Sequence, residues 1–167
     1  NLFLAHELNV RDIMTPRTVI FALDVNLSVD EVWEAQPQIS FSRIPVYDKS
    51  RDDIVGFVLK SDLLVCALNQ RGHTTLAELR RPIAVVLGRT PMARIFYRLI
   101  GNQDHIALVM EENGEIEGLV TMEDLIETLI GLEIIDESDP VRDMRQLARE
   151  QWARRARHMG LDVDSQE

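Results

Sequence analysis

The chain contains two copies of one sequence unit, and this internal repeat restricts its possible folds more than any other feature. Three parts of the chain match at a spacing of 62 positions: residues 43–48 with 105–110, residues 53–63 with 115–125, and Ser28 with Thr90. Pro16 matches Pro82 at a spacing of 66. The sequence therefore predicts an ungapped repeat over about residues 28–65, preceded by a small difference in length between the copies.

Both copies show the same order of secondary-structure signals. A short strand is expected after the proline, at residues 18–21 in the first copy and 83–86 in the second. A helix start follows, marked by the capping-box pattern of Ser28 and Glu31 and by Thr90-Pro91, a cap followed by proline. Two β-branched strands joined by a polar turn come next. The closing helices are expected at residues 61–69 and 122–130.

This order predicts an α/β (α+β) fold made of two β-α-β-β-α units. One unit of about sixty residues would expose an apolar sheet face and would be only marginally stable alone. Two copies can bury these faces against each other about a pseudo-twofold axis, and we expect a ligand in the groove between them. The predicted segments are an N-terminal helix or linker (1–9), repeat 1 (10–72), repeat 2 (73–139), and a C-terminal helix and tail (140–167).

Charge and hydropathy exclude several classes of protein. The net charge is −10 and the pI is about 4.9, whereas nucleic-acid-binding domains normally carry a basic face. The longest apolar runs, such as residues 83–87, are far shorter than the roughly 20 residues that a membrane span needs. We therefore expect a soluble chain, without a secretory signal peptide and without a nucleic-acid partner.

The most informative polar pattern lies in the second copy, in residues 118–124. Thr121 falls where a strand is expected to turn into a helix, and Asp124 falls in the first helical turn. A carboxylate can accept hydrogen bonds from both hydroxyls of a ribose, and a threonine hydroxyl with helix N-terminal amides can reach phosphates. The same spacing also fits a capping arrangement with no ligand, so both interpretations stay open.

The first copy offers a weaker version of this pattern. Leu59 stands in place of Thr121, although Asp62 still matches Asp124, so we expect a weaker or empty half-site there. Other polar candidates from the first copy are Thr15, Ser42 and Arg43. The guanidinium of Arg43 suits phosphate oxygens, but an ion pair with a nearby acid is an equally good interpretation.

No catalytic constellation is apparent in the sequence. The four histidines are scattered, and glycine-loop, nucleophile-elbow and His-x-x-x-His motifs are missing. We therefore predict that the chain is not an enzyme and has no dedicated metal site. The carboxylates at residues 133–139 could hold a divalent cation, but a solvated acidic loop is the favoured interpretation.

Several motifs together resemble a known family, the tandem CBS (cystathionine-β-synthase) domain pair, and in particular the pair of the cyclin-M and CorC magnesium-transport proteins. The resemblance covers about residues 10–139. It is carried by Val10-Arg11-Asp12-Ile13-Met14-Thr15-Pro16-Arg17, Ser42-Arg43-Ile44-Pro45-Val46-Tyr47-Asp48, His105-Ile106-Ala107-Leu108-Val109, and Gly118-Leu119-Val120-Thr121-Met122-Glu123-Asp124-Leu125-Ile126-Glu127.

The resemblance implies an adenine nucleotide, ATP with Mg²⁺ or AMP, bound between the two repeats. The implied ligand residues are Thr15, Ser42 and Arg43 from the first copy and Leu119, Thr121 and Asp124 from the second. Thr121 and Asp124 would hold the ribose, and Leu119 would flank the adenine. The resemblance further implies a homodimer at the cytoplasmic face of a membrane, attached to a transmembrane domain.

These implications predict a regulatory module rather than a catalyst. In this hypothesis the nucleotide biases the arrangement of the repeats or of the dimer, and so reports to the membrane domain. Two alternatives remain open at this point. One is a dimerisation module with no small ligand, and the other is a direct divalent-cation sensor that uses the acidic residues 133–139.

Overall fold

The computed structural model describes residues 8–138 and Ala153, and it divides the chain into two compact units. Unit 1 consists of residues 1–20 and 84–167, and unit 2 consists of residues 21–83. Of the predicted N-terminal helix or linker, only Leu8 and Asn9 are described, and neither is helical. The predicted C-terminal helix lies outside the described residues, apart from Ala153.

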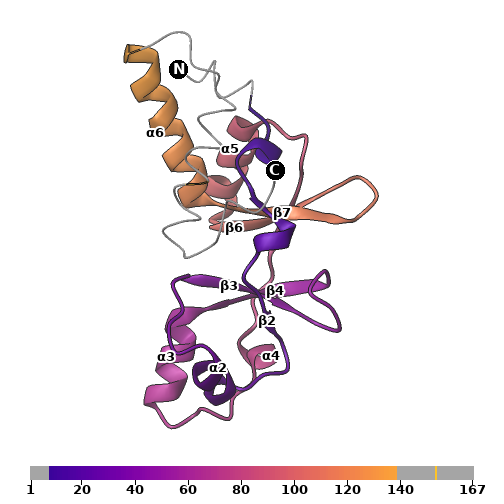
Figure 1. Ribbon diagram of the computed structural model, residues 1–167, viewed down its shortest axis with the longest axis vertical. Helices are drawn as coiled ribbons and strands as arrows, with labels where there is room; N and C mark the ends of the chain where they lie inside the picture. Colours follow the sequence, from indigo (N-terminus) through magenta and orange to yellow (C-terminus); the bar gives the residue numbers. More distant parts are fainter. Residues whose placement is uncertain (1–7, 139–152, 154–167) are drawn as a thin grey trace. The chain divides into compact units, whose positions relative to one another are not determined.

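Unit 2 is a three-stranded sheet with helices on one face (Figure 1). Strand β3 (Arg43–Tyr47) lies between β2 (Leu23–Asp24), which is parallel to it, and β4 (Ile54–Leu59), which is antiparallel. The helices are α2 (Val29–Ala35), α3 (Lys60–Leu68) and α4 (Leu76–Leu79). Helix α2 begins with the predicted capping box, in which the Glu31 backbone N–H donates to Ser28 Oγ and the Ser28 N–H donates to Glu31 Oε2.

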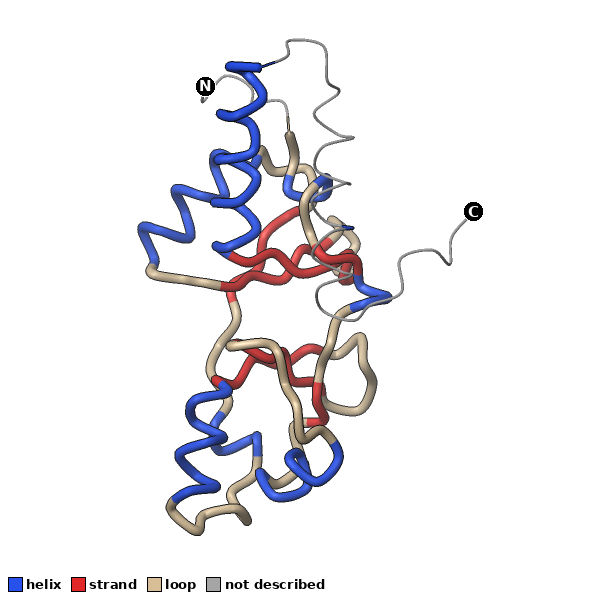
Figure 2. The backbone as a smooth tube through the Cα atoms, turned by 60° about the vertical axis from the view of Figure 1, so that its left-hand side comes forward, coloured by secondary structure: helices blue, strands red, loops and turns tan. Residues whose placement is uncertain are grey.

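Unit 1 repeats this arrangement with a four-stranded sheet in the order β1-β7-β6-β5. The strands are β1 (Thr15–Pro16), β5 (Ala84–Leu87), β6 (Ile106–Met110) and β7 (Ile116–Thr121), and the helices are α5 (Met92–Asn102) and α6 (Met122–Ser138). Figure 2 shows the α-helices gathered on one face of the sheet in each unit. The predicted mixed α/β fold of two related units is confirmed.

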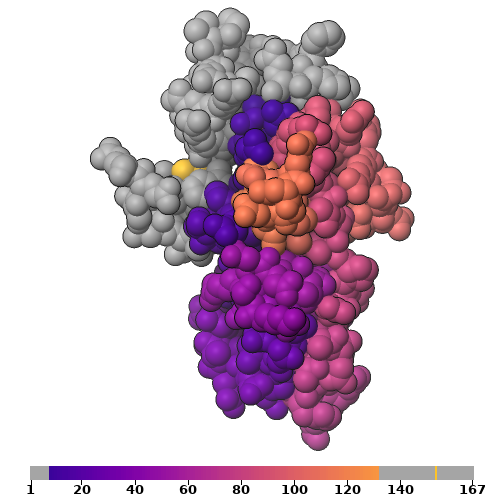
Figure 3. All heavy atoms as spheres, turned by 90° about the vertical axis from the view of Figure 1, so that its right-hand side faces the viewer, coloured from indigo at the N-terminus to yellow at the C-terminus, as the bar shows by residue number. Residues whose placement is uncertain are grey.

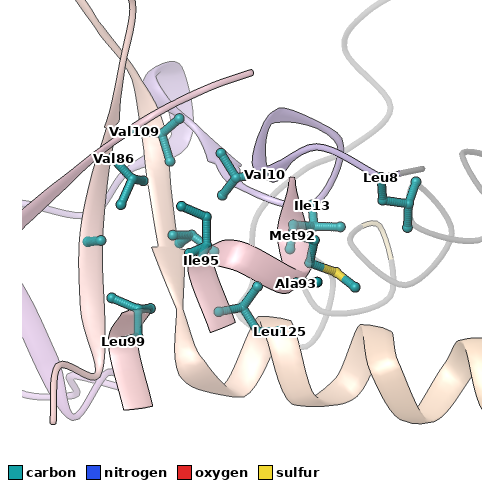
Figure 4. Close-up of a cluster of buried hydrophobic side chains, with 12 residues drawn as sticks. Leu8, Val10, Ile13, Val86, Met92, Ala93, Ile95, Leu99, Val109 and Leu125 are labelled. Atoms are coloured by element: carbon teal, nitrogen blue, oxygen red, sulfur yellow. The ribbon is translucent and has the colours of Figure 1, made fainter. Parts of the chain in front are cut away.

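The core of unit 1 forms between its sheet and its helices. Met92, Ile95 and Leu99 are spaced by three and four residues, so they share one face of α5 and are almost completely buried. Figure 4 shows them packed with buried side chains from the sheet, from α6 and from the N-terminal segment. Burying a side chain such as Leu99 contributes roughly 1.5–3 kcal/mol, so these contacts hold the helix on the sheet.

The segment that leads into each repeat pairs with a strand of the other repeat. Strand β1 lies at the start of repeat 1 but pairs with β7 of repeat 2, so that Thr15 lies opposite Leu119. In the same way Arg81 precedes β5 but forms an antiparallel bridge with Phe57 of β4. Figure 3 shows the indigo N-terminal residues among the pink and orange residues of the second repeat. This exchange explains why residues 1–20 belong to unit 1.

A glycine permits each of these close approaches. A Cβ atom at Gly118 would meet the carbonyl oxygen of Thr15, and a Cβ atom at Gly56 would meet the carbonyl oxygen of Arg81. Backbone atoms cannot move aside as a flexible side chain can. The two glycines, 62 positions apart in the repeat, therefore admit the leading segments to the sheet edges.

The structure corrects the predicted alignment of the two copies. Arg43 pairs with Leu59, whereas Ile106 pairs with Thr121, so β3 and β6 correspond at a spacing of 63 while β4 and β7 correspond at 62. The ungapped alignment was therefore wrong, because the turn between the two strands is one residue shorter in repeat 2. Helices α2 and α5 also begin 63 positions apart, so Ser28 corresponds to Pro91 and not to Thr90.

A short inserted turn explains the larger spacing near the N-terminus. The predicted strand at residues 18–21 is wrong: residues Arg17–Val19 form a three-residue 3₁₀ helix, η2, and the strand is β2 at Leu23–Asp24. This turn accounts for the change in spacing from 66 to 63.

The prediction of an acidic loop at residues 133–139 was wrong for residues 133–138, because α6 continues to Ser138. The side chains of residues 132–138 lie outside the described part of the chain.

Candidate functional site

The first group of predicted ligand residues lies where β7 turns into α6. Thr121 is the last residue of β7, and Met122 is the first of α6. The backbone N–H of Thr121 donates to Asp124 Oδ2 at 3.1 Å, and the Asp124 N–H donates to Thr121 Oγ1 at 3.2 Å. The two side chains therefore cap the helix reciprocally, as the ligand-free interpretation of the motif requires. A carboxylate can accept about four hydrogen bonds, so capping is compatible with ligand binding.

Two further predicted residues lie beside this cap. The pairing of β1 with β7 brings Thr15 opposite Leu119, two residues before Thr121. Leu119 is 8% exposed, Asp124 is 7% exposed, and Thr15 and Thr121 are half-buried. We call the set of Thr15, Leu119, Thr121 and Asp124 the unit 1 junction; it combines an apolar side chain, two hydroxyls and a carboxylate within one unit.

The start of α6 is fixed by hydrogen bonds on both sides of the cap. The Met122 N–H donates to the carbonyl oxygen of His105 at 3.0 Å, which ties the helix start to the beginning of β6. One turn further on, the buried hydroxyl of Thr128 donates to the carbonyl oxygen of Asp124 at 2.7 Å. The carboxylate of Asp124 therefore projects from a firmly held backbone, as a ligand-binding residue requires.

Ser42 and Arg43 belong to unit 2 and lie at the start of β3. The carbonyl oxygen of Ser42 accepts a hydrogen bond from the N–H of Lys60 at 2.9 Å, and Arg43 pairs with Leu59. Ser42 is exposed and Arg43 is half-buried. Four of the six predicted residues are thus brought together in unit 1, and the other two lie together in unit 2.

Unit 2 contains the counterpart of the unit 1 junction, with different chemistry. Leu59 occupies the N-cap of α3 and has no side-chain atom that can accept a hydrogen bond. The carboxylate of Asp62 accepts a hydrogen bond from Arg81, whose Nη2 lies 2.9 Å from Asp62 Oδ2. We call Leu59, Asp62 and Arg81 the unit 2 junction. The sequence analysis missed Arg81, although the spacing of 66 between Pro16 and Pro82 aligns it with Thr15.

Two further carboxylates, Glu123 and Glu127, lie in the first two turns of α6, near Asp124 in the sequence. Burial, and next the negative charge of Glu123, raise the pKa of Glu127 above its ordinary value. Within the described residues there is no cluster of three or more histidines, cysteines or acids that could hold a metal ion. None of the helices in the described part of the chain is both long and apolar enough to span a bilayer.

Two α/β units with exchanged leading segments and corresponding strand-to-helix junctions define a tandem-repeat domain. The family model of the CBS domain matches the chain twice, at residues 10–68 and 76–131. The chain therefore belongs to the CBS-domain family, as the sequence motifs predicted.

Within that family the chain is similar to proteins of the CorC and CNNM group. It is 34% identical to the magnesium and cobalt efflux protein CorC of Escherichia coli over 149 residues, which are 88% of this chain and 51% of CorC. It thus spans about half the length of this relative. The CBS domain of a bacterial CNNM/CorC family Mg²⁺ transporter in complex with ATP is 31% identical, with a TM-score of 0.72 over 78% of this chain and 92% of that chain.

A third comparison concerns another nucleotide complex. A CBS-domain pair with bound AMP from Klebsiella pneumoniae is 27% identical, with a TM-score of 0.67 over 74% of this chain and 99% of that chain. The chain is accordingly a CBS module of the CorC/CNNM family. Relatives with bound ATP and with bound AMP both share its fold.

Proposed function

We propose that the chain is a regulatory module that binds an adenine nucleotide, ATP with Mg²⁺ or AMP, as the cytoplasmic part of a membrane protein that transports magnesium or another divalent cation. The observation that carries this proposal is the unit 1 junction, where a buried carboxylate and a hydroxyl meet at the start of a helix. The nucleotide complexes of two similar CBS modules support it.

In this proposal each residue of the unit 1 junction has a separate task. Asp124 accepts hydrogen bonds from the ribose hydroxyls, and the hydroxyls of Thr15 and Thr121 add polar contacts. Leu119 offers an apolar surface to the adenine. These residues match the chemistry of a nucleoside, because ribose hydroxyls need hydrogen-bond acceptors and adenine needs an apolar contact. The pairing of β1 with β7 holds both kinds of side chain in one unit.

The phosphates pose a separate electrostatic problem. The chain carries a net charge of −10, so a nucleotide triphosphate is repelled unless cations accompany it. Mg²⁺ would neutralise part of the phosphate charge when bound to ATP. Arg43 and Ser42 are the proposed phosphate ligands, and we expect ATP to bind more tightly when Mg²⁺ is present.

Binding by itself does not regulate a membrane protein. A nucleotide shifts a conformational equilibrium only by the difference in its affinity for two states. The proposal is therefore that the nucleotide stabilises one arrangement of the module, and that the attached transmembrane domain responds. Its role is regulatory and not catalytic, since the proposed ligand residues bind and do not form a nucleophile with a base.

The proposed partner of the chain is a second copy. Leu68 of α3 is 83% exposed and Ile130 of α6 is 55% exposed. Each lies four residues after another exposed apolar residue, Leu64 or Ile126, so each helix presents an apolar stripe. The two stripes are 62 positions apart in the repeat, and a homodimer would cover both.

A dimerisation module with no small ligand is the second candidate function. Two observations favour it: Thr121 and Asp124 already satisfy each other as a helix cap, and the apolar stripes on α3 and α6 are exposed. Sedimentation velocity on Leu68→Glu, with Asn69→Glu at the exposed end of α3 as control, tests dimerisation. Only the Leu68 variant should be a monomer.

Isothermal titration with ATP, ADP and AMP, each with and without Mg²⁺, tests nucleotide binding. Asp124→Ala should lower the affinity roughly 10- to 100-fold, because a charge-assisted hydrogen bond contributes roughly 1.5–3 kcal/mol. Glu123→Ala is the matched control, because it removes the same charge from an exposed neighbour on α6. Equal losses in both variants would contradict the ribose role, and no binding by the unaltered chain would favour the dimerisation module.

A further inference from the structure

The unit 2 junction corresponds in position to the unit 1 junction. Leu59 and Asp62 correspond to Thr121 and Asp124, because each pair begins the closing helix of its repeat. Arg81 corresponds to Thr15, because Arg81 lies opposite Phe57 while Thr15 lies opposite Leu119, its counterpart in the other repeat. A tandem pair built in this way has two places where the same kind of ligand could bind.

Arg81 is held in place by its backbone as well as by its side chain. Its N–H donates to the carbonyl oxygen of Phe57 at 2.8 Å, and its own carbonyl oxygen accepts from the Phe57 N–H at 3.0 Å. From this fixed position the guanidinium reaches the carboxylate of Asp62, with Nη2 and Oδ2 at 2.9 Å. A long cation therefore stands where unit 1 has the short side chain of Thr15.

The consequences for a ribose are direct. Its hydroxyls would donate to the carboxylate of Asp62, which already accepts a charge-assisted hydrogen bond from Arg81. The ligand meets the guanidinium beside that carboxylate, at the position where unit 1 has only the short side chain of Thr15, and it finds no hydroxyl at Leu59 to replace the contact that Thr121 offers in unit 1. Both differences act against binding at the same junction.

We infer that Arg81, together with Leu59, closes the unit 2 junction to nucleotide, so that each chain has one nucleotide site and not two. This inference rests on the proposed function and assigns to Arg81 the role of a specificity-determining residue. The Arg81–Asp62 pair is partly exposed, with 51% and 32% of the two side chains accessible, so it contributes little to folding. Its effect lies in the competition with a ligand for the carboxylate.

The variant Leu59→Thr/Arg81→Thr recreates in unit 2 three of the four residues of the unit 1 junction, and Phe57 stays as the apolar counterpart of Leu119. The experiment places this pair of substitutions in an Asp124→Ala background, which weakens binding in unit 1, so that a gain over the same background can be assigned to unit 2. The probes are AMP and ATP with Mg²⁺, measured by isothermal titration, with circular dichroism to verify folding. Leu59→Thr/Arg80→Thr in the same background is the matched control, since Arg80 is an exposed neighbour with the same charge.

The expected result has two parts. The unaltered chain binds one nucleotide per chain, and the Leu59→Thr/Arg81→Thr variant binds at least tenfold more tightly than the Arg80 control, equivalent to about 1.4 kcal/mol. Two equivalent sites in the unaltered chain, or no gain from the Arg81 substitution in a folded variant, would overturn the inference. So would weaker binding after Arg81→Thr alone, because Arg81 would then be a ligand of the phosphates.

The proposed function and this inference fail in different ways. If the unaltered chain binds no nucleotide, the proposed function fails and the one-site part of the inference fails with it, whereas the role of Arg81 is still decided by whether the Leu59→Thr/Arg81→Thr variant binds more tightly than the Arg80 control. If the unaltered chain binds and Asp124→Ala weakens binding as expected, the proposed function stands, and the inference depends on the gain in the Asp124→Ala background alone.

Discussion

Substituting Gly118 by alanine should separate the role of the β1–β7 pairing from that of the ligand residues. An added Cβ would meet the carbonyl oxygen of Thr15 and the side chain of Met14, and the carbonyl belongs to backbone that pairs with β7. Methionine can change rotamer at little cost, but β1 cannot move without losing its pairing. Gly118→Ala should therefore displace Thr15 from its position opposite Leu119.

The magnitude follows from the cost of overfilling a packed site, about 1–3 kcal/mol. In a chain of 167 residues each kcal/mol lowers the melting temperature by roughly 2–4 °C, so we expect a decrease of roughly 2–12 °C. Differential scanning calorimetry measures this decrease. Titration with AMP should show weaker binding at a temperature where the variant is still folded.

Gly101 provides the matched control. It lies in α5 with nothing within 4 Å of an added Cβ, so Gly101→Ala should raise the stability by roughly 0.4–1 kcal/mol, because alanine loses less conformational entropy on folding. A Gly118→Ala variant as stable as the unaltered chain would refute the reasoning. Equal destabilisation by both substitutions would do the same.

Three further predictions concern separate parts of the chain. Hydrogen bonds from the Ser28 N–H and hydroxyl lower the pKa of Glu31, and those from Thr75 lower the pKa of Glu78. The two carboxylates should therefore stabilise the folded chain fully above about pH 4.5, and this stabilisation should be lost as the pH falls through their lowered pKa values in the folded state. Glu31→Gln and Glu78→Gln should remove this pH dependence, which melting curves between pH 3 and 7 would measure. Leu99→Ala should cost about 2–5 kcal/mol by urea unfolding, since Leu99 is fully buried; a smaller loss would mean that the core collapses around the gap. Thr121→Val should cost about 1 kcal/mol through the lost cap, whereas Thr121→Ser should retain most of it.

The local patterns in the sequence predicted the elements of the site. The strand-to-helix turn at Thr121 and Asp124 was correct, because capping depends on residues only three positions apart. The capping box of Ser28 and Glu31 was correct for the same reason. The strand at residues 18–21 was wrong, because β-branched residues also fit a short 3₁₀ turn, and only the pairing partner decides between them.

The one-residue error in the repeat alignment has a related cause. The turn before β7 is one residue shorter than the turn before β4. An alignment of residue types could not reveal this difference, since both turns are polar and tolerate a change in length. Pairing across the sheet fixes the register, because a shift by one residue would turn every side chain to the opposite face.

By itself the sequence determined the number of repeats, their mixed α/β class, and the difference between Thr121 and Leu59 at the helix starts. These properties follow from residue type and short-range spacing. The tertiary structure decided that the leading segments exchange between the repeats, and so that Thr15 joins Leu119 while Arg81 reaches Asp62. The physical reason is that a strand pairs with whichever sheet edge has an open row of backbone groups and room for its approach, and that edge is formed by residues distant in the chain.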